Sequence, residues 1–211
     1  MFRRVAMFVF ALIFGVPATL LAHEVGHLLV ARWFGVRVLG VSIGIGRELF
    51  GFSDRHGIRW ALSAWPVGGS IKIHDDRTAS SGSKPDTLSS KSYAQRAAIY
   101  AAGPASNFLL ALLVYGLCFL LFGEVAVPGG YSDNPAVLVA CWLSYVSILV
   151  GMFNLIPIPP LDGASLAFIA FEALAKKTIP DDIMETLRML GVIMLGVIAP
   201  LLVLVILAEN F

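Results

Sequence analysis

The sequence is poor in charge and in cysteine. Only 14% of its 211 residues are charged, against about 25% in ordinary soluble domains, while 58% are hydrophobic. With a mean hydropathy of +0.83, this balance excludes an ordinary soluble domain. The net charge of +1, without any run of like charges, argues against a nucleic-acid partner. The two cysteines, Cys118 and Cys141, lie in apolar segments without metal-ligand spacing, so we expect buried free thiols rather than a disulfide.

Long apolar segments predict a polytopic α-helical membrane protein with about four transmembrane helices, because one span needs about 20 apolar residues. The expected spans cover residues 5–34, 93–122, 136–156 and 181–207. A polar, β-rich loop over 36–91 follows the first span, and the third is followed by a loop over 157–163 and a cytoplasmic helix over 164–177. We expect residues 1–211 to form a single domain.

The distribution of basic residues predicts the orientation in the membrane. Ten of the fifteen Lys and Arg residues lie between 32 and 96, whereas residues 123–135 contain none. The positive-inside rule therefore places the long loop in the cytoplasm and the N-terminus outside.

Two segments of the long loop are rich in β-branched and aromatic residues. They are 36–45 and 58–73, and because the turn-like sequence FSDRHG separates them we expect a short β-hairpin. Trp60 and Trp65 are expected to touch the membrane interface. Glycines suited to bulges or close backbone approach, and hence candidate substrate contacts, are Gly44, Gly46, Gly68 and Gly69.

The first apolar segment contains the sequence HEVGH, in which Glu24 is the only charged residue between Val5 and Ala31. His23 and His27 are four residues apart and share one face of a helix, which suits two nitrogen ligands of a tetrahedral Zn²⁺. Glu24 can then reach the open position of the metal, as in a metalloprotease. A carboxylate inside a membrane helix costs roughly 2.5–3.5 kcal/mol on insertion scales, and such a cost usually marks function.

Asp162 is the candidate third ligand. It lies in NLIPIPPLDG, residues 154–163, where three prolines and a glycine prevent a regular helix. Its carboxylate can complete a His₂Asp zinc shell. Two alternatives stay open: Asp162 caps the next helix, or Glu172 is the ligand. His56 and His74 are isolated loop histidines without partner spacing, and we expect them to be solvated.

Three separated motifs together resemble the site-2 protease family of intramembrane zinc metalloproteases. They are HEVGH, the sequence AGPASN at 102–107, and NLIPIPPLDG, and the resemblance covers nearly the whole chain. It implies one Zn²⁺ cofactor and a catalytic acid and base at Glu24. The zinc ligands that it implies are His23, His27 and Asp162.

The same resemblance implies further roles. Asn107 and Asn154 would form hydrogen bonds near the substrate, and the 40–73 segment would be the membrane-associated β-hairpin, whose edge can pair with an unwound substrate. The sequence departs from the family between 123 and 135, which is far too short for the PDZ domains that relatives of this branch insert there.

The activity implied is hydrolysis of peptide bonds within or near transmembrane helices of single-pass proteins, such as anti-sigma factors or signal-peptide remnants. The implied location is a bacterial cytoplasmic membrane, with the active site toward the cytoplasm. A transmembrane-helix substrate and membrane lipid are the expected partners, and the oligomeric state is left open. Two other classes are a catalytically silent binding scaffold and a divalent-metal transporter, although the second and fourth spans lack His, Asp and Glu in their apolar cores.

Overall fold

The computed structural model describes residues 14–75, 85–124, 132 and 134–210. The chain divides into two compact units, Met1–Phe153 and Asn154–Phe211, which are described separately. The elements of the first unit are α2 (Val16–Trp33), β1 (Val38–Ser53), β2 (Arg59–Ile73), α3 (Tyr93–Phe122) and α4 (Pro135–Asn154), of which α4 ends at the boundary. Those of the second are α5 (Asp162–Ala175) and α6 (Asp181–Asn210). A single domain over 1–211 stays a prediction.

Small residues bring α2 and α3 into close contact. A Cβ atom on Gly26 of α2 would lie 2.5 Å from the carbonyl oxygen of Ala102 and 2.6 Å from Ser106 Oγ, so only glycine allows this approach. The Ser106 hydroxyl also lies 2.8 Å from the carbonyl oxygen of Ala22. The turn of α2 that carries HEVGH is therefore held directly against α3.

Helix α3 has well-defined ends. The Ser92 hydroxyl accepts a hydrogen bond from the backbone N–H of Gln95, and the Gln95 side chain accepts one from the backbone N–H of Ser92. This capping box fixes the start of the helix. Gly123, in the left-handed conformation with φ of 67°, ends it.

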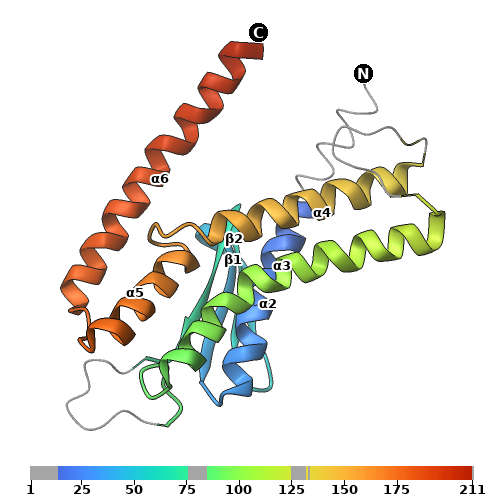
Figure 1. The fold of residues 1–211 in the computed structure, drawn as a ribbon. Helices are drawn as coiled ribbons and strands as arrows, with labels where there is room; N and C mark the ends of the chain where they lie inside the picture. Colours follow the sequence, from blue (N-terminus) through green and yellow to red (C-terminus); the bar gives the residue numbers. More distant parts are fainter. Residues whose placement is uncertain (1–13, 76–84, 125–131, 133, 211) are drawn as a thin grey trace. The chain divides into compact units, whose positions relative to one another are not determined.

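Helices α3 and α4 lie side by side (Figure 1). Ser147 Oγ donates to the carbonyl oxygen of Asn107 at 2.9 Å, and Ser144 Oγ donates to that of Ala111 at 3.4 Å. Among the described residues, these two helices are the ones long and apolar enough to span a membrane. Two of the four predicted spans thus meet this criterion, and four transmembrane helices stay a prediction.

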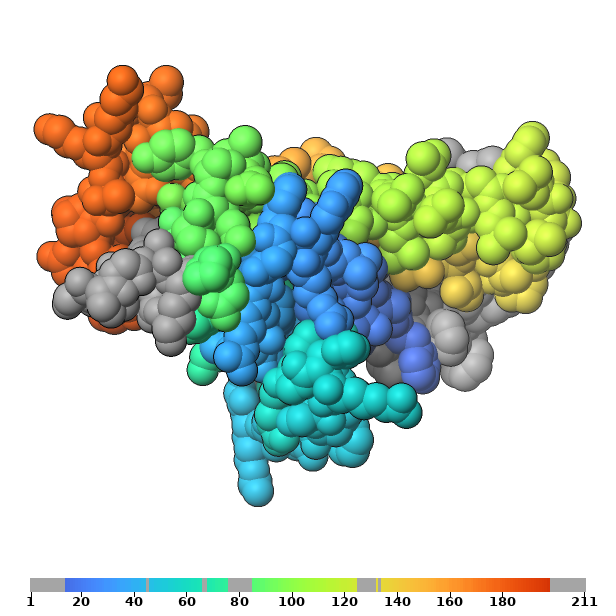
Figure 2. Space-filling model, turned by 90° about the horizontal axis from the view of Figure 1, so that it is seen from below, coloured from blue at the N-terminus to red at the C-terminus, as the bar shows by residue number. Residues whose placement is uncertain are grey.

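The strands β1 and β2 form an antiparallel pair in which both strands bend. Residues 40–43 pair with 69–72 and also with 59–62, which pair in turn with 50–53. The bends coincide with glycines at positive φ, namely Gly44 (88°), Gly46 (98°) and Gly68 (76°). Positive φ strains any residue that carries a Cβ atom, so glycine permits these bends. The strand residues, cyan to teal in Figure 2, project beside α2.

Asp54 fixes the turn between the strands. Its Oδ1 accepts the backbone N–H groups of His56 at 2.8 Å and Ile58 at 2.9 Å, while Oδ2 accepts the indole N–H of Trp60 at 3.2 Å. The bond from Ile58 is the largest cause that holds the pKa of Asp54 below its usual value. The turn thus depends on an ionised carboxylate.

The hydrophobic core of the first unit joins α2, the sheet and the start of α3. Its buried members are Leu28, Ala31, Val36, Val38, Val41, Ile58, Leu88 and Ile99. Trp60 packs against this cluster and is partly buried, whereas Trp65 is 70% exposed, and contact of either ring with the membrane interface stays a prediction. Cys118 and Cys141 are buried free thiols, as predicted, in a smaller cluster between α3 and α4.

In the second unit, α5 begins at Asp162, and Leu161 is its N-cap residue without a side-chain cap bond. The alternative in which Asp162 caps this helix is therefore wrong, since the residue is already helical. Its carboxylate still interacts favourably with the positive end of the helix dipole. The last residue of α5 is Ala175, two residues before the predicted 177, and Lys176, with φ of 53°, is the C-cap.

Most predicted boundaries lie within two residues of the observed ones. The span predicted over 93–122 coincides with α3, and α4 ends at Asn154 rather than 156 because prolines follow. Residues 5–13 of the first predicted span lie outside the described residues. The largest error concerns β1, which runs to Ser53 rather than ending at 45, because its second half pairs with β2 beyond the glycine bend.

Candidate metal centre

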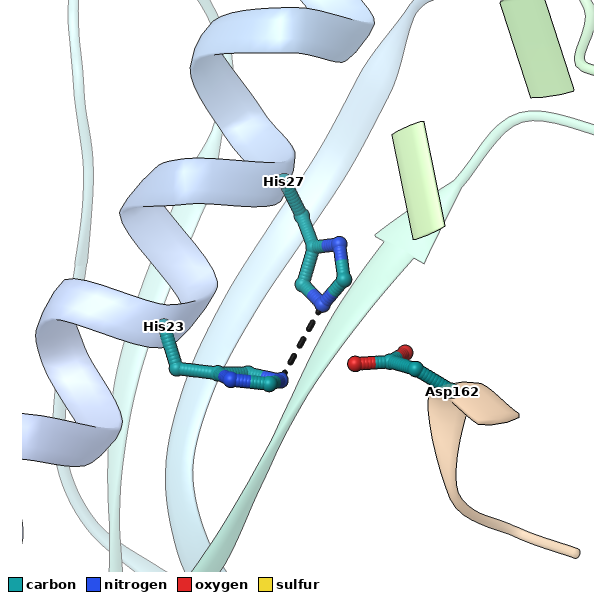
Figure 3. A group of neighbouring side chains, drawn as sticks. All are labelled: His23, His27 and Asp162. Atoms are coloured by element: carbon teal, nitrogen blue, oxygen red, sulfur yellow. Dashed lines mark hydrogen bonds between the residues drawn. The ribbon is translucent and has the colours of Figure 1, made fainter. Parts of the chain in front are cut away.

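The two histidines of HEVGH lie on one face of α2, and both are buried. The Nε2 atoms of His23 and His27 are 3.1 Å apart, with the ring planes at 81° (Figure 3). Two nitrogen ligands at about 2.0–2.1 Å from a tetrahedral zinc ion lie about 3.3 Å apart. The two Nε2 atoms are therefore spaced as ligands of one metal ion.

The backbone of α3 sets the tautomer of His27. Its Nδ1 lies 2.7 Å from the carbonyl oxygen of Ile99, and both groups are buried. A carbonyl oxygen only accepts hydrogen bonds, so Nδ1 carries the proton and Nε2 of the neutral ring keeps its lone pair. This is the hydrogen bonding expected of a histidine that binds metal through Nε2.

Asn107 lies beside Nδ1 of His23, as the Ile99 carbonyl lies beside Nδ1 of His27. Its Nδ2 lies 3.2 Å from His23 Nδ1, and the side chain is fully buried. Its Oδ1 has no hydrogen-bond partner among the described residues. An orphaned buried acceptor next to a candidate ligand, together with two imidazole nitrogens at ligand spacing, fits a metal ion at this position.

Gly103 completes a stripe on α3 with Ile99 and Asn107, each four residues from the next. A Cβ atom on Gly103 would lie 2.6 Å from Cε1 of His27 and 2.7 Å from Cε1 of His23, and closer still to His27 Nε2. The glycine therefore leaves the space that both rings occupy. Sequence reasoning treated it only as a small packing residue, although the spacing of four was a signal that it shares a face with Asn107.

Glu24 is 3% exposed and lies against strand β2. A Cβ atom on Gly69 would lie 2.5 Å from Glu24 Oε1, so the strand backbone contacts the carboxylate directly. The close backbone approach expected of this glycine is thus to the candidate catalytic group. Gly44, Gly46 and Gly68 occur instead where the strands bend, and contact of these glycines with substrate stays a prediction.

Two carboxylates of α5 were candidates for the third ligand. Asp162, also drawn in Figure 3, is half-buried at the first residue of the helix. Glu172 is ten residues further on, about 15 Å along the axis, and is 1% exposed. Its Oε1 accepts the backbone N–H of Ile179 at 3.3 Å, so it holds the connection to α6. Asn154 is the last residue of α4.

The other two histidines have separate surroundings. His56 is exposed in the hairpin turn, as expected. His74 is not solvated as expected, because its Nδ1 lies 3.6 Å from Asp86 Oδ2 and its side chain is only 23% exposed. His23 and His27 are thus the candidate metal ligands of the first unit, and Asp162 as the third ligand stays a prediction.

Comparison with known proteins gives a family. The sequence model described as Peptidase family M50 matches residues 9–198. A predicted zinc metalloprotease of Agrobacterium fabrum is 44% identical over 115 residues, which cover 49% of this chain and 30% of that protein. The regulator of sigma-E protease RseP of Salmonella typhimurium is 40% identical over 121 residues, covering 56% of this chain and 26% of that protein.

Among solved structures, the site-2 protease from Methanocaldococcus jannaschii is 18% identical, with a TM-score of 0.41, over 80% of this chain and 62% of that chain. The matches to the two curated relatives span less than a third of those proteins' lengths.

Proposed function

Because the chain belongs to peptidase family M50, the site-2 protease family of zinc metalloproteases, we propose that it is an intramembrane zinc endopeptidase. Its substrates would be single-pass membrane proteins, cut within or near their transmembrane helices. Anti-sigma factors and signal-peptide remnants are the expected examples. The observation that carries the proposal is the buried trio of His23, Glu24 and His27 on adjacent turns of α2, enclosed by α3 and β2.

The proposed ligands are His23, His27 and Asp162. The two histidines supply Nε2 atoms at ligand spacing, and a carboxylate is the third ligand type that completes a catalytic zinc shell while leaving one position open. Asp162 is favoured over Glu172 because Glu172 already accepts the backbone N–H of Ile179. When bound, Zn²⁺ supplies Lewis-acid polarisation of a peptide carbonyl and a more acidic water molecule.

Glu24 would act as general base and then as general acid. Its carboxylate takes a proton from the attacking water and passes it to the amine nitrogen that leaves. Burial beside Gly69 keeps bulk water away from the carboxylate and holds it against the backbone of β2. The same contact brings the reacting group next to a sheet edge.

That edge supports the proposed mode of substrate binding. The carbonyls of a helix are engaged in its own hydrogen bonds, so a transmembrane substrate must unwind before it is cut. Residues 69–72 pair with 40–43 on one side, and no described strand pairs with their other side. A substrate added there as a strand would recover the lost backbone bonds, and Gly69 would place its scissile carbonyl near Glu24.

Family M50 proteins of the site-2 type are embedded in membranes, and the apolar helices α3 and α4 suit this location. We propose a bacterial cytoplasmic membrane, with the active site toward the cytoplasm and the N-terminus outside, from the distribution of basic residues. Exposed apolar side chains on the hairpin support its contact with membrane lipid. They include Leu49, Phe50 and Phe52.

Co-expression with a single-pass helical reporter tests the function. The wild-type chain should cut the reporter, whereas Glu24→Gln should keep zinc, hold the reporter and leave it uncut. Substantial cleavage by this variant would show that Glu24 is not the base. A wild-type chain that holds the reporter uncut would indicate a silent binding scaffold, and zinc transport into vesicles without cleavage would indicate a transporter.

A further inference from the structure

We propose that Asn107 is a positioning residue that selects which nitrogen of His23 is available to metal, by turning its side-chain amide. The inference rests on the proposed function only in taking His23 as a zinc ligand. It deepens that function by explaining why a fully buried amide beside this ring has one atom, Oδ1, without a partner among the described residues.

Three contacts of the two rings fit together in one arrangement of protons. The Ile99 carbonyl requires the proton of His27 on Nδ1, so His27 Nε2 is an acceptor. The 3.1 Å contact between the two Nε2 atoms then requires the proton of His23 on Nε2. His23 Nδ1 is left as an acceptor, and Asn107 Nδ2 donates to it across 3.2 Å. Each of these three contacts then has one donor and one acceptor.

Metal binding requires a different arrangement at His23 alone. A zinc ion needs the Nε2 lone pairs of both rings, and His27 already presents one. The single proton of the neutral His23 ring must then reside on Nδ1 instead of Nε2. Nδ1 becomes a donor, so the Nδ2 group of Asn107 no longer suits it, whereas Oδ1 of the same amide accepts from it.

Asn107 is built so that only its amide needs to move. Its backbone is held inside α3, and its carbonyl oxygen accepts a hydrogen bond from Ser147 Oγ of α4 at 2.9 Å. A half-turn about the terminal side-chain bond exchanges Nδ2 and Oδ1 with little change in shape. The side chain therefore supports the metal-free tautomer with Nδ2 and the metal-bound tautomer with Oδ1.

The test measures which ring nitrogen of each histidine carries the proton, rather than substrate cleavage. The full chain, labelled with ¹⁵N-histidine and held in detergent or nanodiscs, is examined by NMR with and without Zn²⁺, and the four histidines are assigned by single replacements. In the wild type, the protonated nitrogen of His23 should change from Nε2 to Nδ1 when zinc is added. His27 should keep its proton on Nδ1 in both states and so serves as an internal control.

Two variants separate positioning from packing. Asn107→Asp keeps the shape but only accepts, so His23 should carry its proton on Nδ1 even without zinc, and zinc should bind at least as tightly as to the wild type. Asn107→Leu keeps the volume but offers no acceptor, and zinc affinity should fall about 10–100-fold, as for other residues that orient a metal ligand. Affinity is measured by competition with a chelator.

The proposal is overturned if zinc-free Asn107→Asp keeps the His23 proton on Nε2, or if the wild type binds zinc in the chelator competition but shows one His23 tautomer in both states. It is also overturned if Asn107→Leu binds zinc like the wild type while His27 keeps its signal. Should the leucine variant lose the His27 signal through misfolding, the isosteric aspartate variant decides the question. If chelator competition shows that the wild type binds no zinc, it is the proposed function that fails.

Discussion

Replacement of Gly103 by alanine tests whether the close packing of α3 against α2 creates the metal centre. The added Cβ atom would lie 2.6 Å from His27 Cε1, which is 0.8 Å short of the 3.4 Å at which ordinary contact begins. The two helices are also in close contact at Gly26, where an added Cβ atom would lie 2.5 Å from the carbonyl oxygen of Ala102. Separation of the backbones would break this contact and is therefore unfavourable. The imidazoles must move instead.

A movement of this size exceeds what a zinc site tolerates, since ligand distances in such sites vary by only about 0.2 Å. We therefore expect Gly103→Ala to weaken zinc binding by roughly 100-fold or more, which corresponds to about 2.8 kcal/mol. Overpacking should also lower the free energy of unfolding by about 1–3 kcal/mol. Zinc affinity is measured by chelator competition, and stability by thermal unfolding of the zinc-free protein in detergent.

Gly116 provides a matched control in the same helix. A Cβ atom there meets nothing within 4 Å, so Gly116→Ala should leave zinc affinity unchanged and should not destabilise the helix. If Gly103→Ala binds zinc as tightly as Gly116→Ala does, the space left by Gly103 is not what accommodates the ligands, and this reasoning is refuted.

Three further predictions follow from the site and the hairpin. Asp162→Ala should lose zinc affinity by more than about 100-fold, while Glu172→Gln keeps it; the opposite result in a zinc assay would make Glu172 the ligand. Gly69→Ala should slow reporter cleavage at unchanged zinc content, because its Cβ atom displaces the Glu24 carboxylate; full activity would show that this contact is unimportant. The hairpin turn should loosen in acid. The folded-state pKa of Asp54 is lowered from 3.8, so its contribution is complete well above pH 3.8 and is lost as pH falls through the still lower folded value. Hydrogen exchange of the Ile58 amide measures this, and equal acid sensitivity in Asp54→Ala would contradict it.

The helices and the site chemistry could be predicted well from local patterns. The span predicted over 93–122 coincides with α3, whose capping box at Ser92 and terminal Gly123 both act within one helical turn. The HEVGH spacing likewise placed His23 and His27 on one face, because helical periodicity alone decides it. The family assignment, which rested on three such motifs, is confirmed by the match over residues 9–198.

The errors lie where distant contacts decide the outcome. The continuation of β1 to Ser53 depends on the pairing of residues 50–53 with 59–62 across the turn. The β-propensity of residues 46–53 alone does not predict this pairing. Local sequence likewise did not show that the Asp54 carboxylate and the core hold the ring of Trp60. Asp162 was read as a possible cap, but it is the first residue of α5, and Leu161 is the N-cap residue.

The sequence by itself determined the kind of chemistry, because the identity and spacing of the two histidines and Glu24 are properties of one short helix. Only the tertiary structure decided the tautomer, the space and the hydrogen-bond partners of these side chains. The Ile99 carbonyl sets the tautomer of His27, Gly103 leaves room for both rings, and Asn107 faces His23, all from a helix more than seventy residues away. These are contacts between two packed backbones, and hydrogen-bond partners and free space of that kind arise only when the helices meet.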